Sequence, residues 1–239
     1  ATRGLTMRRL LPILFAAAVV ATGPVRAAER DSRTAPDGRG IFSLQLENDL
    51  VQNTDRHYTH GTRFSYVTPE GDIPDAVDDA ADAVPLFPGE GRKRASFILG
   101  QNIYTPSNIK LRDPPTADRP YAGWLYGGVG LVSDTGRRYD NLELDLGIVG
   151  QQSYAEDTQK FVHGVIGANQ PQGWHNQLKN EPGVVLTYER AWRGVAQAYP
   201  LDFAADLSPH VGGSLGNVFT QAAGGLILRV GRDLPDDYG

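Results

Sequence analysis

The sequence predicts an all-β protein, an antiparallel transmembrane β-barrel of about eight strands with a short helix in an extracellular loop. Three observations predict this fold: apolar and polar residues alternate in short segments, long and short connections alternate between the segments, and Tyr and Trp gather near segment ends. The clearest alternation runs Asn141, Leu142, Glu143, Leu144, Asp145, Leu146, Gly147 and Ile148. In a barrel the aliphatic side chains face lipid and the carboxylates face a polar lumen. The same pattern also fits a half-exposed strand of a soluble sandwich.

The connections decide which end of the sheet carries the site. The expected strands span residues 41–49, 58–67, 94–104, 121–132, 138–149, 182–192, 199–211 and 217–231. Barrels place short turns on the periplasmic side and long loops outside, so 133–137 and 193–198 are the turns, and 105–120 and 150–181 are the outer loops. The long connection 68–93 breaks this rule, and we expect a short surface helix in it. The densest polar and aromatic clusters then meet at the outer rim, which is the expected site.

Composition limits the class of protein. The 239 residues include no cysteine, which excludes disulfides and cysteine-ligated metals. The net charge of −5 argues against a nucleic-acid partner. A basic segment at 7–9, an apolar run over 10–20 and small residues up to Ala28 predict a secretory signal peptide. We therefore divide the chain into 1–27, upstream residues and signal peptide, and 28–239, an exported outer-membrane barrel domain.

A helix is expected in the longest outer loop. Ser153 and Glu156 have the spacing of a capping box, and a helix from there would end near Gly167. Its apolar side would be formed by Ala155, Val162, Val165 and Ile166. Gln159 and His163 are four residues apart and share one face. The helix therefore presents a histidine above the rim, although a single histidine on an amphipathic helix is more often structural or solvated.

The polar residues at the ends of the first two strands give this histidine a chemical context. Strand alternation places Asp49 and Thr59 on the lumen side and Asn48 on the other side. A neutral His163 beside a carboxylate could activate water as a general base. Oxygen ligands from Asp49, Asn48 and Thr59 suit a hard cation such as Ca²⁺, which would polarise a carbonyl. The sequence has neither the Gly-x-Ser-x-Gly motif of serine hydrolases nor the His-Glu-x-x-His zinc motif.

Six motifs occur in one order from residue 41 to the end of the chain: Glu47–Leu50, Thr54–Gly61, Gly100–Pro106, Asp118–Trp124, Gln159–Gly167 and Pro171–Glu181. Together they resemble the LpxR-type lipid A deacylases. The resemblance implies an outer-membrane barrel of twelve strands, of which this chain would lack about four at its C-terminal end. It also implies an esterase that removes the 3′-linked acyloxyacyl chain of lipid A with Ca²⁺ and an activated water.

The resemblance also assigns roles to single residues. His163 is the general base, Asn48 and Asp49 form a polar pair around Ca²⁺, and Thr59 and Gln159 complete the catalytic set. The family's acidic residue six positions after the histidine is Asn169 here. An amide oxygen can bind Ca²⁺ but adds no charge, so the affinity for the metal could fall.

The remaining motif residues are expected to hold the substrate. Arg119 could pair with lipid A phosphates, while Tyr121 and Trp174 would border the same site. Alternatively, Arg119 belongs to a solvated rim, Tyr121 to a strand-entry turn, and Trp174 wedges the helix against the rim. The expected partners are lipid A or lipopolysaccharide and outer-membrane lipid. Two further functions remain open: a non-catalytic barrel, acting as a pore or structural protein, and a periplasmic β-rich binding protein.

Overall fold

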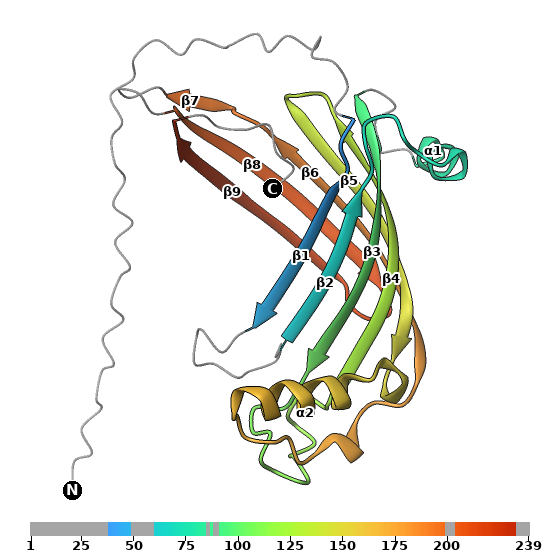
Figure 1. Cartoon of the computed structure of the whole chain (residues 1–239), viewed down its shortest axis with the longest axis vertical. Helices are drawn as coiled ribbons and strands as arrows, with labels where there is room; N and C mark the ends of the chain where they lie inside the picture. Colours follow the sequence, from blue (N-terminus) through green and yellow to red (C-terminus); the bar gives the residue numbers. More distant parts are fainter. Residues whose placement is uncertain (1–37, 49–59, 85–86, 88–90, 199–203, 233–239) are drawn as a thin grey trace, which may run out of the picture.

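The computed structural model describes residues 38–48, 60–84, 87, 91–198 and 204–232, and these form one antiparallel sheet of nine strands. Its strands are β1 (Ile41–Asn48), β2 (His60–Val67), β3 (Arg92–Tyr104), β4 (Ala122–Asp134), β5 (Arg138–Val149), β6 (Glu181–Trp192), β7 (Ala196–Ala198), β8 (Ala204–Gly216) and β9 (Gln221–Gly231). Neighbours in sequence pair from β1 to β6, and β8 then pairs with β6, β7 and β9. Figure 1 shows that the sheet curls strongly, as a barrel wall does. The predicted fold class is confirmed.

The last hairpin differs from the prediction. A strand was expected to end at residue 211, but β8 continues to Gly216 and the turn to β9 falls at 217–220. Gly212, Gly213 and Gly216 lie inside the strand. A Cβ on Gly216 would overlap the Val184 carbonyl of the neighbouring β6, so glycine allows the close approach of the two strands. The short strand β7 was also missed.

The two faces of the sheet have opposite character. Large apolar side chains are exposed on its outer face, among them Leu44, Leu46, Phe64, Leu99, Val129, Leu144, Leu146, Val184, Leu186, Leu226 and Leu228. The concave face buries polar groups, including Glu143 and Asp145. Arg63 on β2 donates two hydrogen bonds of 2.7 Å to Glu143 on β5, although β3 and β4 lie between them in the sheet. The concave face is therefore a polar lumen, and the outer face is the apolar surface that a barrel turns to lipid.

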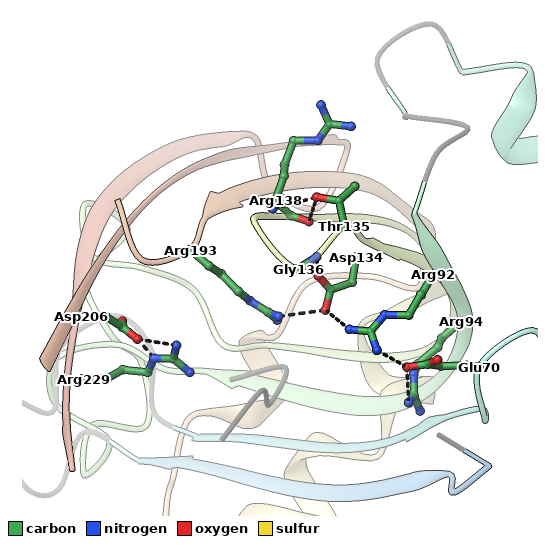
Figure 2. A network of polar contacts seen from close by, with 10 residues as sticks. All are labelled: Glu70, Arg92, Arg94, Asp134, Thr135, Gly136, Arg138, Arg193, Asp206 and Arg229. Carbon is green, nitrogen blue, oxygen red and sulfur yellow. Dashed lines mark hydrogen bonds and ion pairs between the residues drawn. The ribbon is translucent and has the colours of Figure 1, made fainter. Parts of the chain in front are cut away.

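The connections between β3 and β4 and between β5 and β6 leave the sheet at the end where β1 ends and β2 begins, and the helix α2 (Ala155–Ile166) lies across that end (Figure 1). We call this end the α2 rim. Figure 2 shows the polar contacts of the opposite rim, where Arg193 contacts Asp134 at 2.8 Å and Arg92 contacts Glu70 at 3.1 Å. Of the polar clusters predicted to meet at one end, those at 101–121 and 153–174 lie here, and most of the first, 47–59, is outside the described residues.

The connection after β2 contains the expected short helix, α1 (Asp75–Asp82). Lys93 of β3 contacts Asp78 of α1, and Phe87 packs on the outer-face residue Leu131. The segment therefore covers part of the outer face near the opposite rim. Of the helices in the described residues, none is long and apolar enough to cross a membrane.

Candidate active site

The helix α2 is held against β3 and β4 by a tight backbone approach. Gly123 of β4 has no side chain, and a Cβ there would overlap Ser153 Oγ and Ala155 Cβ. Gln101 of β3 donates a 2.6 Å hydrogen bond to the Ser153 carbonyl. The start of the helix is thus fixed to two strands by one glycine and one glutamine.

The predicted capping box at this start is wrong. Ser153 belongs to a short 3₁₀ turn (Gln151–Ser153), and its hydroxyl donates to the Gly150 carbonyl. The residue before the helix is Tyr154, with a positive φ of 57° and no side-chain cap. The hydroxyl satisfies the turn rather than the helix, so α2 begins one residue later than the capping box implied. Its end was predicted correctly, at Gly167 with a φ of 68°.

A buried cluster of aromatic and aliphatic side chains packs against the start of α2. Trp174 is 1% exposed and Tyr121 is fully buried, and their rings lie 4.8 Å apart. The Trp174 indole N–H donates a 2.7 Å hydrogen bond to Oε1 of Gln159, itself 2% exposed. The cluster consists of Ile103, Ile109, Tyr121, Ala155 and Trp174. Trp174 therefore wedges α2 against the rim, as one of the alternatives predicted. Contact of Tyr121 or Trp174 with a substrate stays a prediction.

The helix lies on the outer face of the sheet and not over the lumen. The helix contacts Gln101, Ile103 and Gly123, directly or through the buried cluster. Along β3 and β4 these residues alternate with those of the concave face, so they lie on the same side of the sheet as Leu99. In the unbroken register of β1 with β2, Asn48 occupies an outer-face position opposite His60. Strand alternation in the sequence assigned Asp49 and Thr59 to the lumen side. Both residues lie outside the described part of the chain.

His163 lies on α2, and one of its ring nitrogens already has a hydrogen-bond partner. Its Nδ1 lies 2.6 Å from the backbone carbonyl oxygen of Asn169. Since a carbonyl only accepts, Nδ1 carries the hydrogen, and Nε2 of the neutral ring keeps its lone pair. The turn that follows α2 therefore fixes both the tautomer and the direction of this imidazole.

The length of α2 carries His163 away from β4. A rise of about 1.5 Å per residue puts His163 roughly 12 Å along the helix from Ala155, which is about two to three strand spacings. Figure 1 shows α2 running from the ends of β4 and β5 toward those of β1 and β2. His163 is thus brought to the side of the sheet where Asn48 ends β1.

Only one of the proposed Ca²⁺ ligands has a described side chain. Asn169 is exposed at the end of α2, and its neutral amide oxygen is a donor that fits a hard cation. Within the described residues no group of three or more His, Asp or Glu side chains could hold a metal ion. The carboxylate that such a site requires, Asp49, is outside that part, so the Ca²⁺ site stays a prediction.

Arg119 lies at the lumenal side of the α2 rim. Its guanidinium stands 5.5 Å from the centre of the Tyr104 ring. It also lines a cavity of about 270 Å³ whose walls include Trp124, Val149 and Phe219. The structure therefore separates Arg119 from the outer face that carries His163, and its pairing with a phosphate stays a prediction.

The two long loops of the α2 rim are tied to each other by exposed polar contacts. His175 Nε2 lies 3.1 Å from Asp113 Oδ1, and Asn176 donates to the Arg112 carbonyl at 3.0 Å. The hydrogen bond from His175, with that from Asn176, holds the pKa of Asp113 below its ordinary value. Asp118 folds the first loop onto itself by accepting hydrogen bonds from Ser107.

Three polar residues on the outer face beside α2 were given no role at the site from the sequence. Gln101 of β3 anchors the helix, and on the neighbouring β2 His60 Nε2 lies 2.7 Å from Thr62 Oγ1. All three occupy strand positions where the alternation puts an apolar side chain. A polar residue at a lipid-facing position was the signal that could have identified them.

The fold and this site define a class of protein: an outer-membrane type of barrel wall that carries a histidine-bearing helix on the outer face of one rim. A family model described as "Outer membrane protein LpxR" matches residues 13–239, and the chain belongs to this family of outer membrane proteins. This confirms the resemblance found in the sequence.

Among solved structures, LpxR from Salmonella typhimurium has a similar fold, with a TM-score of 0.60 and 23% sequence identity. The alignment covers 82% of this chain and 64% of that chain, so this chain spans less than two thirds of that protein. Comparison with curated protein sequences gave no match.

Proposed function

We propose that this protein is an outer-membrane esterase that hydrolyses the ester of the 3′-linked acyloxyacyl chain of lipid A, with His163 as general base. The observation that carries the proposal is the hydrogen bond of 2.6 Å between His163 Nδ1 and the Asn169 carbonyl. It leaves Nε2 as a directed proton acceptor, which a general base requires. The position of α2 on the lipid-facing side of the wall supports a substrate that arrives from the membrane.

The reaction needs one water and two proton transfers. As a water oxygen attacks the ester carbonyl, a proton of the water passes to His163 Nε2. The hydrogen bond from Nδ1–H to the Asn169 carbonyl stabilises the imidazolium that forms. The imidazolium then returns the proton to the sugar oxygen as the carbon–oxygen bond breaks. The products are the free acyloxyacyl acid and a sugar hydroxyl. When bound, Ca²⁺ would polarise the carbonyl and hold the developing negative charge. Asn48, Asp49, Thr59 and Asn169 are the residues proposed to hold it.

The test compares His163→Ala with Lys160→Ala, a change one turn earlier on the same helix. Lys160 makes an exposed pair with Glu156, so its loss should leave activity within about twofold. His163→Ala should lower acyl release from purified lipid A by about 10²–10⁴-fold, measured by mass spectrometry. Both variants should keep the heat-modifiable migration of a folded barrel. Full deacylation by His163→Ala would refute the role of the histidine.

The metal is tested separately on the unaltered protein. An excess of a Ca²⁺ chelator should abolish acyl release, and added Ca²⁺ should restore it. Unchanged turnover in excess chelator would remove Ca²⁺ from the mechanism while leaving His163 in place. A folded wild-type barrel that releases no acyl chain with Ca²⁺ present would favour the non-catalytic alternative.

A further inference from the structure

One side of α2 is apolar and exposed. Tyr154, at its start, and Phe161 and Val165 within it are 63%, 71% and 71% exposed. Their spacing of seven and four residues places them within an arc of roughly 40° on the helix. We call these three residues the α2 ridge. Val165 was expected on the apolar side of the helix together with Ala155, but the residues that α2 buries are Ala155 and Gln159.

Two other sides of α2 pack against protein, and they define the direction of the ridge. Ala155 faces the wall. Gln159 and His163 face the returning segment, which leads from α2 back to β6, and bind it through hydrogen bonds with Trp174 and Asn169. His163 is nine residues from Tyr154 and two from Phe161, about half a turn round the helix from the ridge. In Figure 1 the returning segment lies beyond α2 from the sheet. The ridge therefore points back toward the level of the strands.

At that level the wall presents its own exposed apolar surface. Phe97 and Leu99 of β3 lie below Gln101, which anchors α2, and they are 41% and 56% exposed. Phe64 of β2 is 52% exposed and pairs with Leu99. The α2 ridge continues this surface past the ends of the strands. In a family of outer membrane proteins that surface contacts lipid, so lipid should also cover the ridge.

The charged pair of Glu156 and Lys160 fits the same orientation. Glu156 and Lys160 form an exposed pair with side chains 32% and 48% accessible, and they lie on the flank that carries His163. A helix with one apolar and one charged flank lies in the plane of a membrane interface, its apolar flank among the acyl chains. Tyr154 suits such a boundary because its ring is apolar and its hydroxyl polar.

We propose that α2 is an interfacial helix whose ridge of Tyr154, Phe161 and Val165 inserts among the acyl chains of the outer leaflet. Insertion places His163 at the level of the lipid headgroups, where an ester between sugar and acyl chain lies. A lipid could then reach the imidazole by lateral diffusion, without leaving the bilayer. This last consequence rests on the proposed function, whereas insertion itself does not require any hydrolysis.

Insertion can be measured without activity because the chain has no cysteine to interfere with labelling. Phe161→Cys, and Lys160→Cys as the matched position on the other flank, are labelled with a bimane fluorophore. The protein is placed in phosphatidylcholine vesicles whose acyl chains carry bromine. The label at 161 should be quenched by the brominated chains and the label at 160 by iodide in the water. Val165→Cys gives a second ridge position should Phe161→Cys fold poorly.

Two outcomes would overturn the proposal. Quenching of the ridge label by iodide alone would place it in water. Shielding from both quenchers would mean that protein covers it, for example a second copy of the chain.

The functional consequence has its own measurement. Phe161→Ser/Val165→Ser should release acyl chains from lipid A in vesicles about tenfold more slowly, and from detergent-dispersed lipid A at an unchanged rate. Val195→Ser, an equally small change at an exposed residue of the opposite rim, is the control. Equal loss on both forms of substrate would refute delivery through the bilayer. Absence of release by the wild type would refute the esterase, and the quenching result would still decide insertion.

Discussion

Trp174 and Gln159 form a contact that links the loop cluster to the helix that carries the candidate base. Both side chains are almost fully buried, so the indole N–H has no water to replace Gln159 Oε1 as its partner. Trp174→Phe keeps most of the ring but leaves a buried acceptor unpaired, at a cost of about 1–3 kcal/mol. We expect α2 to loosen, its amide hydrogens to exchange faster, and acyl release to fall about tenfold or more.

A matched change at the opposite rim separates this effect from the loss of any tryptophan. Trp192 is 37% exposed at the end of β6, and Trp192→Phe should leave both exchange and activity unchanged. Unaltered exchange in α2 of Trp174→Phe would show that the indole hydrogen bond does not hold the helix. The experiment therefore tests the positioning role of Trp174 rather than a contact with substrate.

On the scale of elements, the docking of α2 depends on one missing side chain. Gly123→Ala adds a Cβ that would overlap Ser153 and Ala155, so the start of the helix must move away from β4. Gly127→Ala adds the same atom four residues further along the outer face of β4, where the nearest atom is 3.7 Å away. We expect Gly123→Ala to lower acyl release about tenfold or more, and Gly127→Ala to leave it unchanged. Heat-modifiable migration, which reports the barrel, should persist in both, and equal activity of the two would contradict the docking geometry.

The tie between the two long loops should depend on pH. Because its folded pKa is depressed, Asp113 contributes to loop stability above the ordinary aspartate value of about 3.9, and the contribution is lost as the pH falls through the lower folded pKa. The protection of amides around 107–114 and 172–177, relative to the exchange rate of an unstructured amide at the same pH, should therefore fall as acid protonates the carboxylate. Asp113→Asn should already exchange faster at pH 6 and change less on acidification. The same acid response in both proteins would assign it to another group.

The positions of the strands and helices along the chain were predicted more accurately than which of their sides are buried. Alternation and turn signals are local, so they located most strands, α1 and the end of α2 at Gly167. The start of α2 was predicted wrongly, and the apolar pattern did not show which side the helix buries, because both depend on what the helix touches. Ser153 is drawn into a turn against β4, and Val165 meets no protein core. For the same reason the sequence placed His163 above the rim but did not reveal Gln101 as its anchor.

At the scale of the whole molecule, the curl of the sheet brings distant strands into contact across the lumen. Alternation placed Arg63 and Glu143 on the lumen side, but their meeting depends on the curvature that β3 and β4 add between them. Gly100 and Gly128 make room at the crossing, since a Cβ on either would overlap Tyr126 or Asp145. No local pattern in the sequence contains this information, which arises from four strands together.

The crossing pair provides a test of that curvature. Arg63→Met removes both hydrogen bonds to Glu143 and leaves two largely buried carboxylates, Glu143 and Asp145, without the guanidinium. Breaking a buried pair on one side destabilises strongly; because the Arg63 side chain is 30% exposed, we expect a loss of about 2–4 kcal/mol. The folded, fast-migrating form should convert to the unfolded form at a lower temperature on a denaturing gel.

The exposed turn residue Arg137 supplies the control, since Arg137→Met should leave the conversion temperature unchanged. Adding Glu143→Leu to Arg63→Met should recover part of the loss, because the change removes one of the unpaired carboxylates. Recovery would mean that the two strands meet in the membrane as the curled sheet requires. If Arg63→Met melted like the wild type, the pair would not span the lumen, and the curvature that brings β2 and β5 together would be contradicted.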